Sequence, residues 1–331
     1  MGAGYTKSQL PTISQRQISR LGFGRLPRII TDAGDRASRR FIEFFVATIR
    51  NENTRLAYAY DIGMFFDWAE QRRFTLDTLE PIVVSAYIEH LCKIYAAPTV
   101  KQHLAAIRML FDWLVTGQIV PMSPASSVRG PKHVVRVGKT PVLSADEARA
   151  LLDSIDVSSV IGLRDRAIIG LMVYSFARVS ATMKMRVDDY YQQGKRWWVR
   201  LHEKGGKRHQ VPTHHLAEEY LDAYVEAAGI DLQDKKAPLF RTLDRQSRLT
   251  AQRLTRNDAL RMIKRRAKGA GLSATTCCHT FRATGITVFI RNGGTIEKAQ
   301  AIAAHDSIRS TKLYDRTGDE ITLDEIERIV I

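Results

Sequence analysis

The sequence is poor in cysteine and has no long apolar run. Its 331 residues include three cysteines, two of them adjacent at Cys277 and Cys278. So few cysteines do not build a disulfide framework, so we expect a protein of the reducing cytoplasm. No stretch approaches the roughly 20 consecutive apolar residues of a transmembrane helix, and the first residues lack the apolar core of a signal peptide. The sequence therefore predicts no membrane partner.

Acidic residues are also in short supply. The chain has 35 Asp and Glu against 50 Lys and Arg, which gives a formal net charge of +15. A charge of this size is unusual for an enzyme of small molecules and indicates a polyanionic partner, most simply nucleic acid. The length allows two domains, each with a core of its own.

The first part of the chain is predicted to be a flexible arm followed by a helical domain. Residues 1–35 are basic, with Gly and Pro among the arginines and little apolar pattern, so either a DNA-contacting tail or a plain disordered terminus is expected. Residues 36–128 carry apolar and aromatic side chains at helical spacing in four segments, near 41–49, 58–68, 84–91 and 100–114. Asn53 and Thr54 fit a cap for the second helix. We expect an all-α domain whose aromatic residues form its core.

A second domain follows a basic linker. Proline and glycine punctuate residues 129–141, where no periodic pattern survives. The domain 142–331 opens with Ser144 and Glu147 at capping-box spacing. A long apolar helix is predicted over about 163–176, then strands near 188–191, 197–201 and 208–212, with a glycine turn joining the last two. Everything after His215 has helical spacing. The predicted fold class is mainly α, with a small antiparallel sheet.

Nine basic residues are candidates for contacts to DNA phosphates. They lie on the polar faces of the first domain's helices, in the linker, beside the glycine turn and in a basic helical run after residue 250. For each of them a solvated charged surface is the alternative. The candidates are Arg55, Lys101, Arg108, Lys132, Arg136, Lys139, Lys207, Arg256 and Arg265.

The stretch 278–314 holds the densest group of reactive side chains. His279 and Arg282 are three positions apart, so they share one face of a helical turn. His305 lies near a predicted helix end, and Tyr314 follows in a segment rich in Arg and Lys. With no cysteine or carboxylate at metal-ligand spacing, this set suits a phosphate better than a metal. On this stretch alone, ordinary half-buried residues of a helical bundle remain an equal alternative.

Two further cations complete an ordered set. Arg178 ends the long apolar helix, and Lys204 lies in the glycine turn. The set resembles the signature of the tyrosine recombinase (phage integrase) family, and the resemblance extends from about Arg36 to the end of the chain. The segments FARVS, EKGGKRHQVP, HTFRAT and AHDSIRSTKLY are similar to the family's boxes around Arg178, Lys204, His279, Arg282, His305 and Tyr314.

This resemblance implies both a fold and a reaction. The implied fold is a two-domain clamp around double-stranded DNA, and the protein would self-associate at a specific recombination site as a tetramer. Tyr314 would attack a phosphodiester and form a 3′-phosphotyrosyl link, without metal, ATP or another cofactor. Arg178 and Arg282 would hold the phosphate oxygens, where two guanidinium forks can do what a metal does elsewhere.

The remaining roles follow from the same resemblance. His305 would donate a hydrogen bond to the phosphate, and His279 would donate or accept a proton near the nucleophile. Lys204 would be the general acid for the departing 5′-hydroxyl. A type IB-like topoisomerase would use the same residues, and a DNA-binding protein that has lost catalysis is a third possibility.

Two positions depart from the family pattern. Ala181 stands where the family usually has Glu or Asp, three residues after the first arginine, and Thr182, Asp188 or Asp189 are candidate substitutes. Ala303-Ala304 replaces the common Leu-Gly before His305. An acidic amphipathic tail, residues 319–331, is expected either to close its own core or, as is common in the family, to dock onto a neighbouring subunit.

Overall fold

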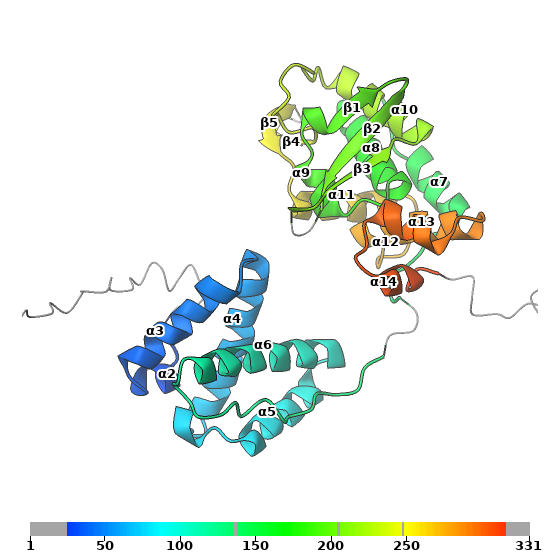
Figure 1. The fold of residues 1–331 in the computed structure, drawn as a ribbon. Coiled ribbons are helices and arrows are strands. Elements are labelled where there is room, and N and C mark those ends of the chain that lie inside the picture. Colours follow the sequence, from blue (N-terminus) through cyan, green and yellow to red (C-terminus); the bar gives the residue numbers. More distant parts are fainter. Residues whose placement is uncertain (1–24, 135–137, 204–205, 247, 316–331) are drawn as a thin grey trace, which may run out of the picture. The chain divides into compact units, whose positions relative to one another are not determined.

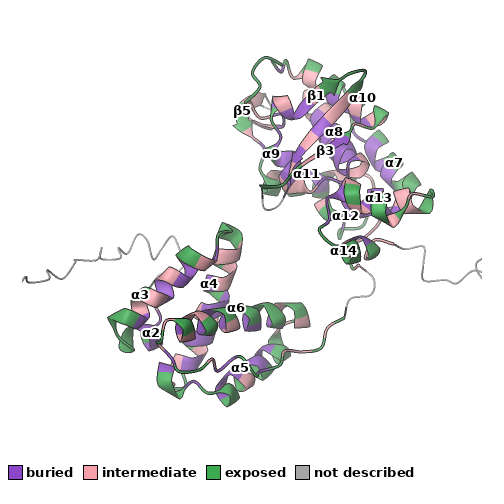
Figure 2. Cartoon of the chain, viewed as in Figure 1, coloured by how far each residue is buried: buried purple, intermediate pink, exposed green. Residues whose placement is uncertain are grey.

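The computed structural model describes residues 25–134, 138–203, 206–246 and 248–315. The chain divides into two compact units, 1–134 and 135–331 (Figure 1). This division falls inside the segment 129–141 that the sequence predicts as a linker. Buried residues gather where the helices of each unit face one another (Figure 2). None of the helices within the described ranges could span a bilayer.

The first unit is built from helices, with no strand between residues 25 and 134. They are α2 (Arg28–Asp32), α3 (Asp35–Glu43), the π-helix η1 (Phe44–Thr48), α4 (Glu52–Glu70), the short 3₁₀ turn η2 (Leu76–Thr78), α5 (Pro81–Ile94) and α6 (Ala97–Thr116). Phenylalanine rings fill the core, because Phe41, Phe45, Phe65, Phe66 and Phe111 are fully buried and meet at tilted or edge-on angles. The expected helical domain with an aromatic core is confirmed.

The predicted flexible arm, residues 1–35, is wrong from Arg28 onward. Helix α2 buries Ile30 completely in the core of the first unit. The backbone N–H of Ile29 donates to Glu70 at 3.1 Å. A helix of five residues is too short to show periodicity in a sequence, so it was not predicted. Residues 1–24 lie outside the described residues. The cap of α4 also differs, because Asn51 rather than Asn53 accepts the hydrogen bond from the Thr54 N–H.

The second unit surrounds a small antiparallel sheet with helices. The sheet has the order β1-β2-β3, with β1 (Tyr190–Gln193), β2 (Arg196–His202) and β3 (Arg208–Pro212). The helices are α7 (Ala145–Asp153), α8 (Val160–Tyr174), α9 (Val179–Lys184), α10 (His215–Ala227), α11 (Arg256–Gly269), α12 (Cys278–Arg291), α13 (Ile296–Ala303) and α14 (Ile308–Lys312), with the 3₁₀ turn η3 (Val187–Asp189). The predicted three strands and the capping box of Ser144 and Glu147 are confirmed.

A second sheet corrects the expectation that only helices follow His215. Strands β4 (Arg241–Leu243) and β5 (Leu249–Arg253) form an antiparallel pair. They are short, each contains one Arg and one Thr, and neither has a buried residue. Such strands lack the apolar alternation by which a half-buried strand is recognised in a sequence.

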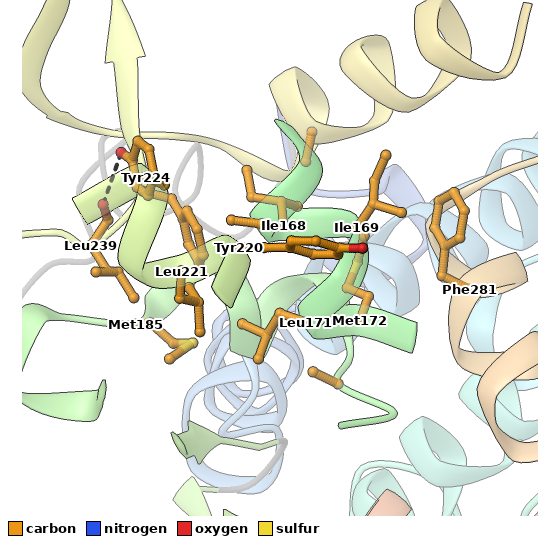
Figure 3. Packing of buried hydrophobic residues seen from close by; sticks show 14 of the residues in the cluster. Ile168, Ile169, Leu171, Met172, Met185, Tyr220, Leu221, Tyr224, Leu239 and Phe281 are labelled. Atoms are coloured by element: carbon orange, nitrogen blue, oxygen red, sulfur yellow. Dashed lines mark hydrogen bonds between the residues drawn. The ribbon is translucent and has the colours of Figure 1, made fainter. Parts of the chain in front are cut away.

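Helix α8 is the centre of the second unit. It packs against α10 and α12, and its Ile168, Ile169, Leu171 and Met172 lie among side chains from both neighbours (Figure 3). Hydrogen bonds connect α8 to α11, because the fully buried Asp165 accepts from Arg266 at 2.8 and 3.0 Å. The adjacent Arg164 bonds to the other oxygen of the same carboxylate.

Helix α12 touches the end of α8 almost backbone to backbone at Gly285. A Cβ atom added there would lie 2.1 Å from the Val173 carbonyl oxygen and 2.8 Å from the ring of Phe176. Only a glycine fits at this distance. The contact brings the first turn of α12 next to the segment that follows α8, and α13 and α14 lie beside them at the orange and red end of the chain (Figure 1).

We predict that Gly285→Ala lowers the free energy of unfolding by about 1–3 kcal/mol, because the methyl group meets a carbonyl that the packed helices cannot move freely. Gly269→Ala is the matched control, since nothing lies within 4 Å of a Cβ atom added at that helical glycine. The control should be neutral or stabilising by up to about 1 kcal/mol. Urea denaturation measures both, and equal effects would contradict the close approach at Gly285.

Candidate active site

Arg282 is the buried centre of the site. Its side chain comes from α12, and the residue is 1% exposed. One terminal nitrogen donates to the carbonyl of Phe176, and the other donates to the carbonyl of Ala303 at 2.5 Å. The Nε atom is buried and has no protein partner. The backbone therefore fixes the plane of the guanidinium group.

Backbone bends accompany both carbonyls that hold Arg282. Phe176 has a φ of 53°, and Ala304, the residue after Ala303, has a φ of 48°. Left-handed backbone costs a residue other than glycine roughly 1 kcal/mol or more, so such bends persist where the surrounding structure requires them. Here each bend lies at a helix end, after α8 and after α13, and the neighbouring carbonyls face the arginine. Ala304, which stands where the family commonly has Gly, thus adopts the left-handed backbone conformation that favours glycine.

Burial and neighbouring charge both act on Arg282. Burial and then the positive charge of Arg178 lower the pKa of Arg282 to about 10, while the neighbouring Glu203 and Tyr314 act in the opposite direction. At neutral pH the guanidinium is still charged. A desolvated cation of this kind favours an anion as its ligand.

His305 lies directly after the bend at Ala304. It is 8% exposed, and its Nδ1 is 2.9 Å from the hydroxyl of Thr311. Burial, followed by the charges of Arg282 and Arg178, lowers its pKa to about 4. The imidazole is therefore neutral near pH 7 and carries one N–H donor.

Tyr314 follows α14 and faces His305. The two rings are stacked, with centroids 5.8 Å apart and planes within 4° of each other. Thr287 of α12 donates to the carbonyl of Tyr314 at 2.8 Å, which ties this segment to the arginine-bearing helix. A second tie comes from the segment before the domain, because the N–H of Gly138 donates to the carbonyl of Leu313 at 3.0 Å.

Arg178 and His279 complete the described part of the site. Arg178 is the N-cap residue of α9, and its half-buried side chain donates to the carboxylate of Glu203. His279 keeps an exposed edge, yet burial of the remainder and then the charges of Arg282 and Arg178 lower its pKa. Five of the six predicted catalytic residues thus lie near one another, and Lys204 lies outside the described residues.

Sequence reasoning missed Glu203. Its carboxylate is the partner of the Arg178 guanidinium, whereas none of the suggested substitutes for Ala181 accepts a hydrogen bond from that guanidinium in the described structure. In the sequence it looked like an ordinary polar residue before a glycine turn. Its position at the end of a strand, directly before Lys204, is the signal that could have marked it.

The site offers cations and hydrogen-bond donors rather than metal ligands. Within the described ranges, no three His, Cys, Asp or Glu side chains are grouped so as to hold a metal ion. Two guanidinium groups and two histidines can bind a phosphodiester and stabilise charge that develops on its oxygens. The phenol of Tyr314 stands beside them as a nucleophile for phosphorus.

The structure divides the nine candidate DNA contacts. Arg55 and Arg108 hold their own domain together, because Arg55 donates twice to the Ile49 carbonyl and Arg108 donates to the carbonyls of Ala125 and Val128. Their guanidinium groups are bound in the fold, which the sequence could not indicate.

The other candidates lie at the surface or outside the described residues. Arg265 is exposed but approaches Asp165 at 3.4 Å, and Lys207 approaches the exposed Asp306 at 3.5 Å. Arg136 lies outside the described residues. Four candidates are exposed, with no ion pair among the described residues: Lys101, Lys132, Lys139 and Arg256.

Family models match both units of the chain. The model of the phage integrase family matches residues 141–320, and that of the phage integrase N-terminal SAM-like domain matches residues 40–118. The chain belongs to the phage integrase family. This integrase is a site-specific tyrosine recombinase, and so are relatives that align with most of its length. A XerD tyrosine recombinase of Listeria innocua is 27% identical over 265 residues, which cover 79% of this chain and 87% of the relative. A XerC tyrosine recombinase of Myxococcus xanthus is 27% identical over 287 residues, covering 85% and 89%.

Solved structures share the fold of this integrase. XerH bound to a palindromic difH substrate, in a post-cleavage complex, matches with a TM-score of 0.67 and 16% identity over 98% of this chain and 89% of that one. A lambda integrase dimer on a COC′ core site matches with a TM-score of 0.64 and 17% identity over 93% and 87%. A lambda integrase tetramer on a Holliday junction matches with a TM-score of 0.63 and 17% identity over 89% and 82%. The predicted fold class, mainly α with a small antiparallel sheet, is confirmed.

We predict that His305 makes the integrase less stable in mild acid. Its folded pKa of about 4 lies below the unfolded value of about 6.5, so the unfolded chain takes up a proton first as the pH falls between these values. Between pH 7 and 4.5 the wild type should lose about 2 kcal/mol more unfolding free energy than His305→Gln. Urea denaturation at both values measures this, with the exposed His90→Gln as a control that follows the wild type. Equal losses in wild type and His305→Gln would show that the ring is not held neutral.

Proposed function

We propose that this recombinase cleaves and rejoins duplex DNA through a covalent bond between Tyr314 and a 3′-phosphate. The observation that supports the proposal is the stacking of the Tyr314 ring on His305, in a segment that Thr287 of α12 binds through the Tyr314 carbonyl. Tyr314, His305 and Arg282 come from three separate helix ends, and together they bring a phenol near a buried cation.

The reaction replaces one phosphate ester bond with another, so it requires no external energy source. The oxygen of Tyr314 forms a bond to phosphorus as the bond from phosphorus to the 5′-oxygen breaks. The phenolic proton passes toward His279 or solvent, and the 5′-oxygen leaves as a hydroxyl after protonation, for which Lys204 is the candidate acid. Arg178, Arg282 and the N–H of His305 bind the phosphate oxygens as charge develops on them. Attack by a 5′-hydroxyl on the phosphotyrosyl bond reverses these steps and joins a strand.

The partners follow from the same family. We infer that the protein binds duplex DNA at a specific site as a two-domain clamp, with Lys101, Lys132, Lys139 and Arg256 among its phosphate contacts. A tetrameric synapse is supported by the lambda integrase tetramer on a Holliday junction, which shares this fold. The tail 319–331, the expected contact to a neighbouring subunit, lies outside the described residues. The cysteines Cys92, Cys277 and Cys278 are free thiols, and a reducing cytoplasm stays the predicted setting.

We predict that the wild type forms an adduct resistant to SDS on a nicked suicide duplex carrying its recombination site, and that Tyr314→Phe forms none, a loss of at least about a hundredfold. The phenolic oxygen is the atom that attacks, and phenylalanine keeps the ring stacked on His305. Tyr60→Phe, at an exposed position of the first unit, should form the adduct at the wild-type rate. An adduct with Tyr314→Phe would overturn the assignment of the nucleophile. Strand exchange between two duplexes, rather than relaxation of a supercoiled plasmid, then distinguishes a recombinase from a topoisomerase.

We predict that Lys101→Ala and Arg108→Ala weaken the protein in different ways. Removing a phosphate contact at the exposed Lys101 should lower DNA affinity and reduce the slope of log affinity against log salt by about one, with stability unchanged. Arg108→Ala leaves two carbonyls without donors and should lower the unfolding free energy by about 1–3 kcal/mol while the salt slope stays near that of the wild type. Binding titrations at several salt concentrations and urea denaturation measure the two effects. A reversed outcome would contradict the division of basic residues made above.

A further inference from the structure

Arg178 has one carboxylate partner, and it does not come from the expected position. Ala181 is completely buried and offers no polar atom to the arginine three residues before it. The hydroxyl of Thr182 donates to the carbonyl of Arg178 at 3.3 Å rather than accepting from its side chain. Asp189 accepts from His202 and lies 3.5 Å from Arg200. Within the described ranges, the carboxylate that meets Arg178 is that of Glu203.

Glu203 is held rigidly at the base of the hairpin between β2 and β3. Its side chain is 3% exposed, and its backbone N–H donates to the Lys207 carbonyl at 2.8 Å, which closes the hairpin. The preceding strand is anchored in the core by Leu201, which is fully buried. The buried carboxylate therefore binds one end of the Arg178 fork at the base of the hairpin.

Glu203 is also the buried negative charge of a cationic site. The charge of Arg178 lowers the pKa values of His279, Arg282 and His305, and the charge of Glu203 opposes this effect at Arg282. The other acidic group that acts on these residues is Asp306, whose side chain is 95% exposed and lies near Lys207. Solvent screens the charge of a carboxylate at the surface, whereas the charge of the buried Glu203 carboxylate is screened much less.

We propose that Glu203 is a positioning residue for strand cleavage, whose carboxylate holds Arg178 in the orientation that meets the scissile phosphate. It supplies from the hairpin the acidic group that is absent at Ala181. One terminal nitrogen of Arg178 is bound to Glu203, and the rest of the fork, on a side chain that is 28% exposed, is left for the phosphate. This role rests on the cleavage by Tyr314 proposed above.

The test separates DNA binding from cleavage on a nicked suicide duplex. Glu203→Gln keeps the shape and removes the charge, and it should slow adduct formation about 10- to 100-fold while DNA affinity changes less than about threefold. The fall in rate at high pH should begin at a lower pH than in the wild type, because the pKa of Arg282 loses the support of this carboxylate. Asp306→Asn removes an exposed charge from the same neighbourhood and should cleave at the wild-type rate.

A second variant addresses the role if Glu203→Gln folds poorly. Glu203→Ala leaves a space beside Arg178, and formate should restore part of its cleavage rate where chloride does not, because a small carboxylate can replace the missing one. Rescue of this kind would not follow from a purely structural role. Glu203→Gln cleaving within threefold of the wild type, or Glu203→Ala insensitive to formate, would overturn the role of Glu203. If the wild type itself forms no adduct that depends on Tyr314, the proposed reaction fails and this role fails with it.

Discussion

The site depends on one buried cation held by the backbone. Arg282 donates to the carbonyls of Phe176 and Ala303, which belong to the segments after α8 and α13. A guanidinium without these acceptors would be too costly to bury, and without the guanidinium the carbonyls would lose their donors. The arginine therefore joins three helix ends, in addition to the phosphate binding proposed for it. Gly285 makes this possible, since it lets α12 approach α8 closely enough for the side chain to reach both carbonyls.

The electrostatics of the site follow from that burial. Burial of both histidines, followed by the positive charges of Arg282 and Arg178, lowers their pKa values. Neutral histidines suit the proposed reaction, since one must pass a proton and the other must donate a hydrogen bond. The buried carboxylate of Glu203 binds Arg178 and raises the pKa of Arg282, so it offsets part of the repulsion between the two arginines. The loss of an acidic residue at Ala181 therefore does not leave the first arginine without a partner.

The sequence predicted most of the fold and the residue types of the site, and its errors have physical causes. The structure brings together five residues that the sequence singled out because phosphate chemistry uses such side chains and their order is distinctive: Arg178, His279, Arg282, His305 and Tyr314. Glu203 was missed because a polar residue beside a glycine turn usually faces solvent, and its burial depends on a partner 25 positions earlier.

The sequence also does not show where a charged side chain points. It shows that Arg55 and Arg108 are charged, but not that their guanidinium groups bind backbone carbonyls of their own domain. The two polar strands β4 and β5 and the five-residue helix α2 were missed for a related reason. Contacts with distant segments, rather than periodicity, create them.

A hydrogen bond joins Gly138, in the predicted linker, to the residue directly before Tyr314. Gly138 lies within residues 129–141, and Leu313 is the residue before Tyr314. A methyl group at Gly138 would come within 2.6 Å of the Leu313 oxygen, so the two strands of backbone are in tight contact. The residue before Tyr314 is therefore bound by the chain that precedes α7, so a change of backbone at Gly138 would displace the segment that carries this tyrosine.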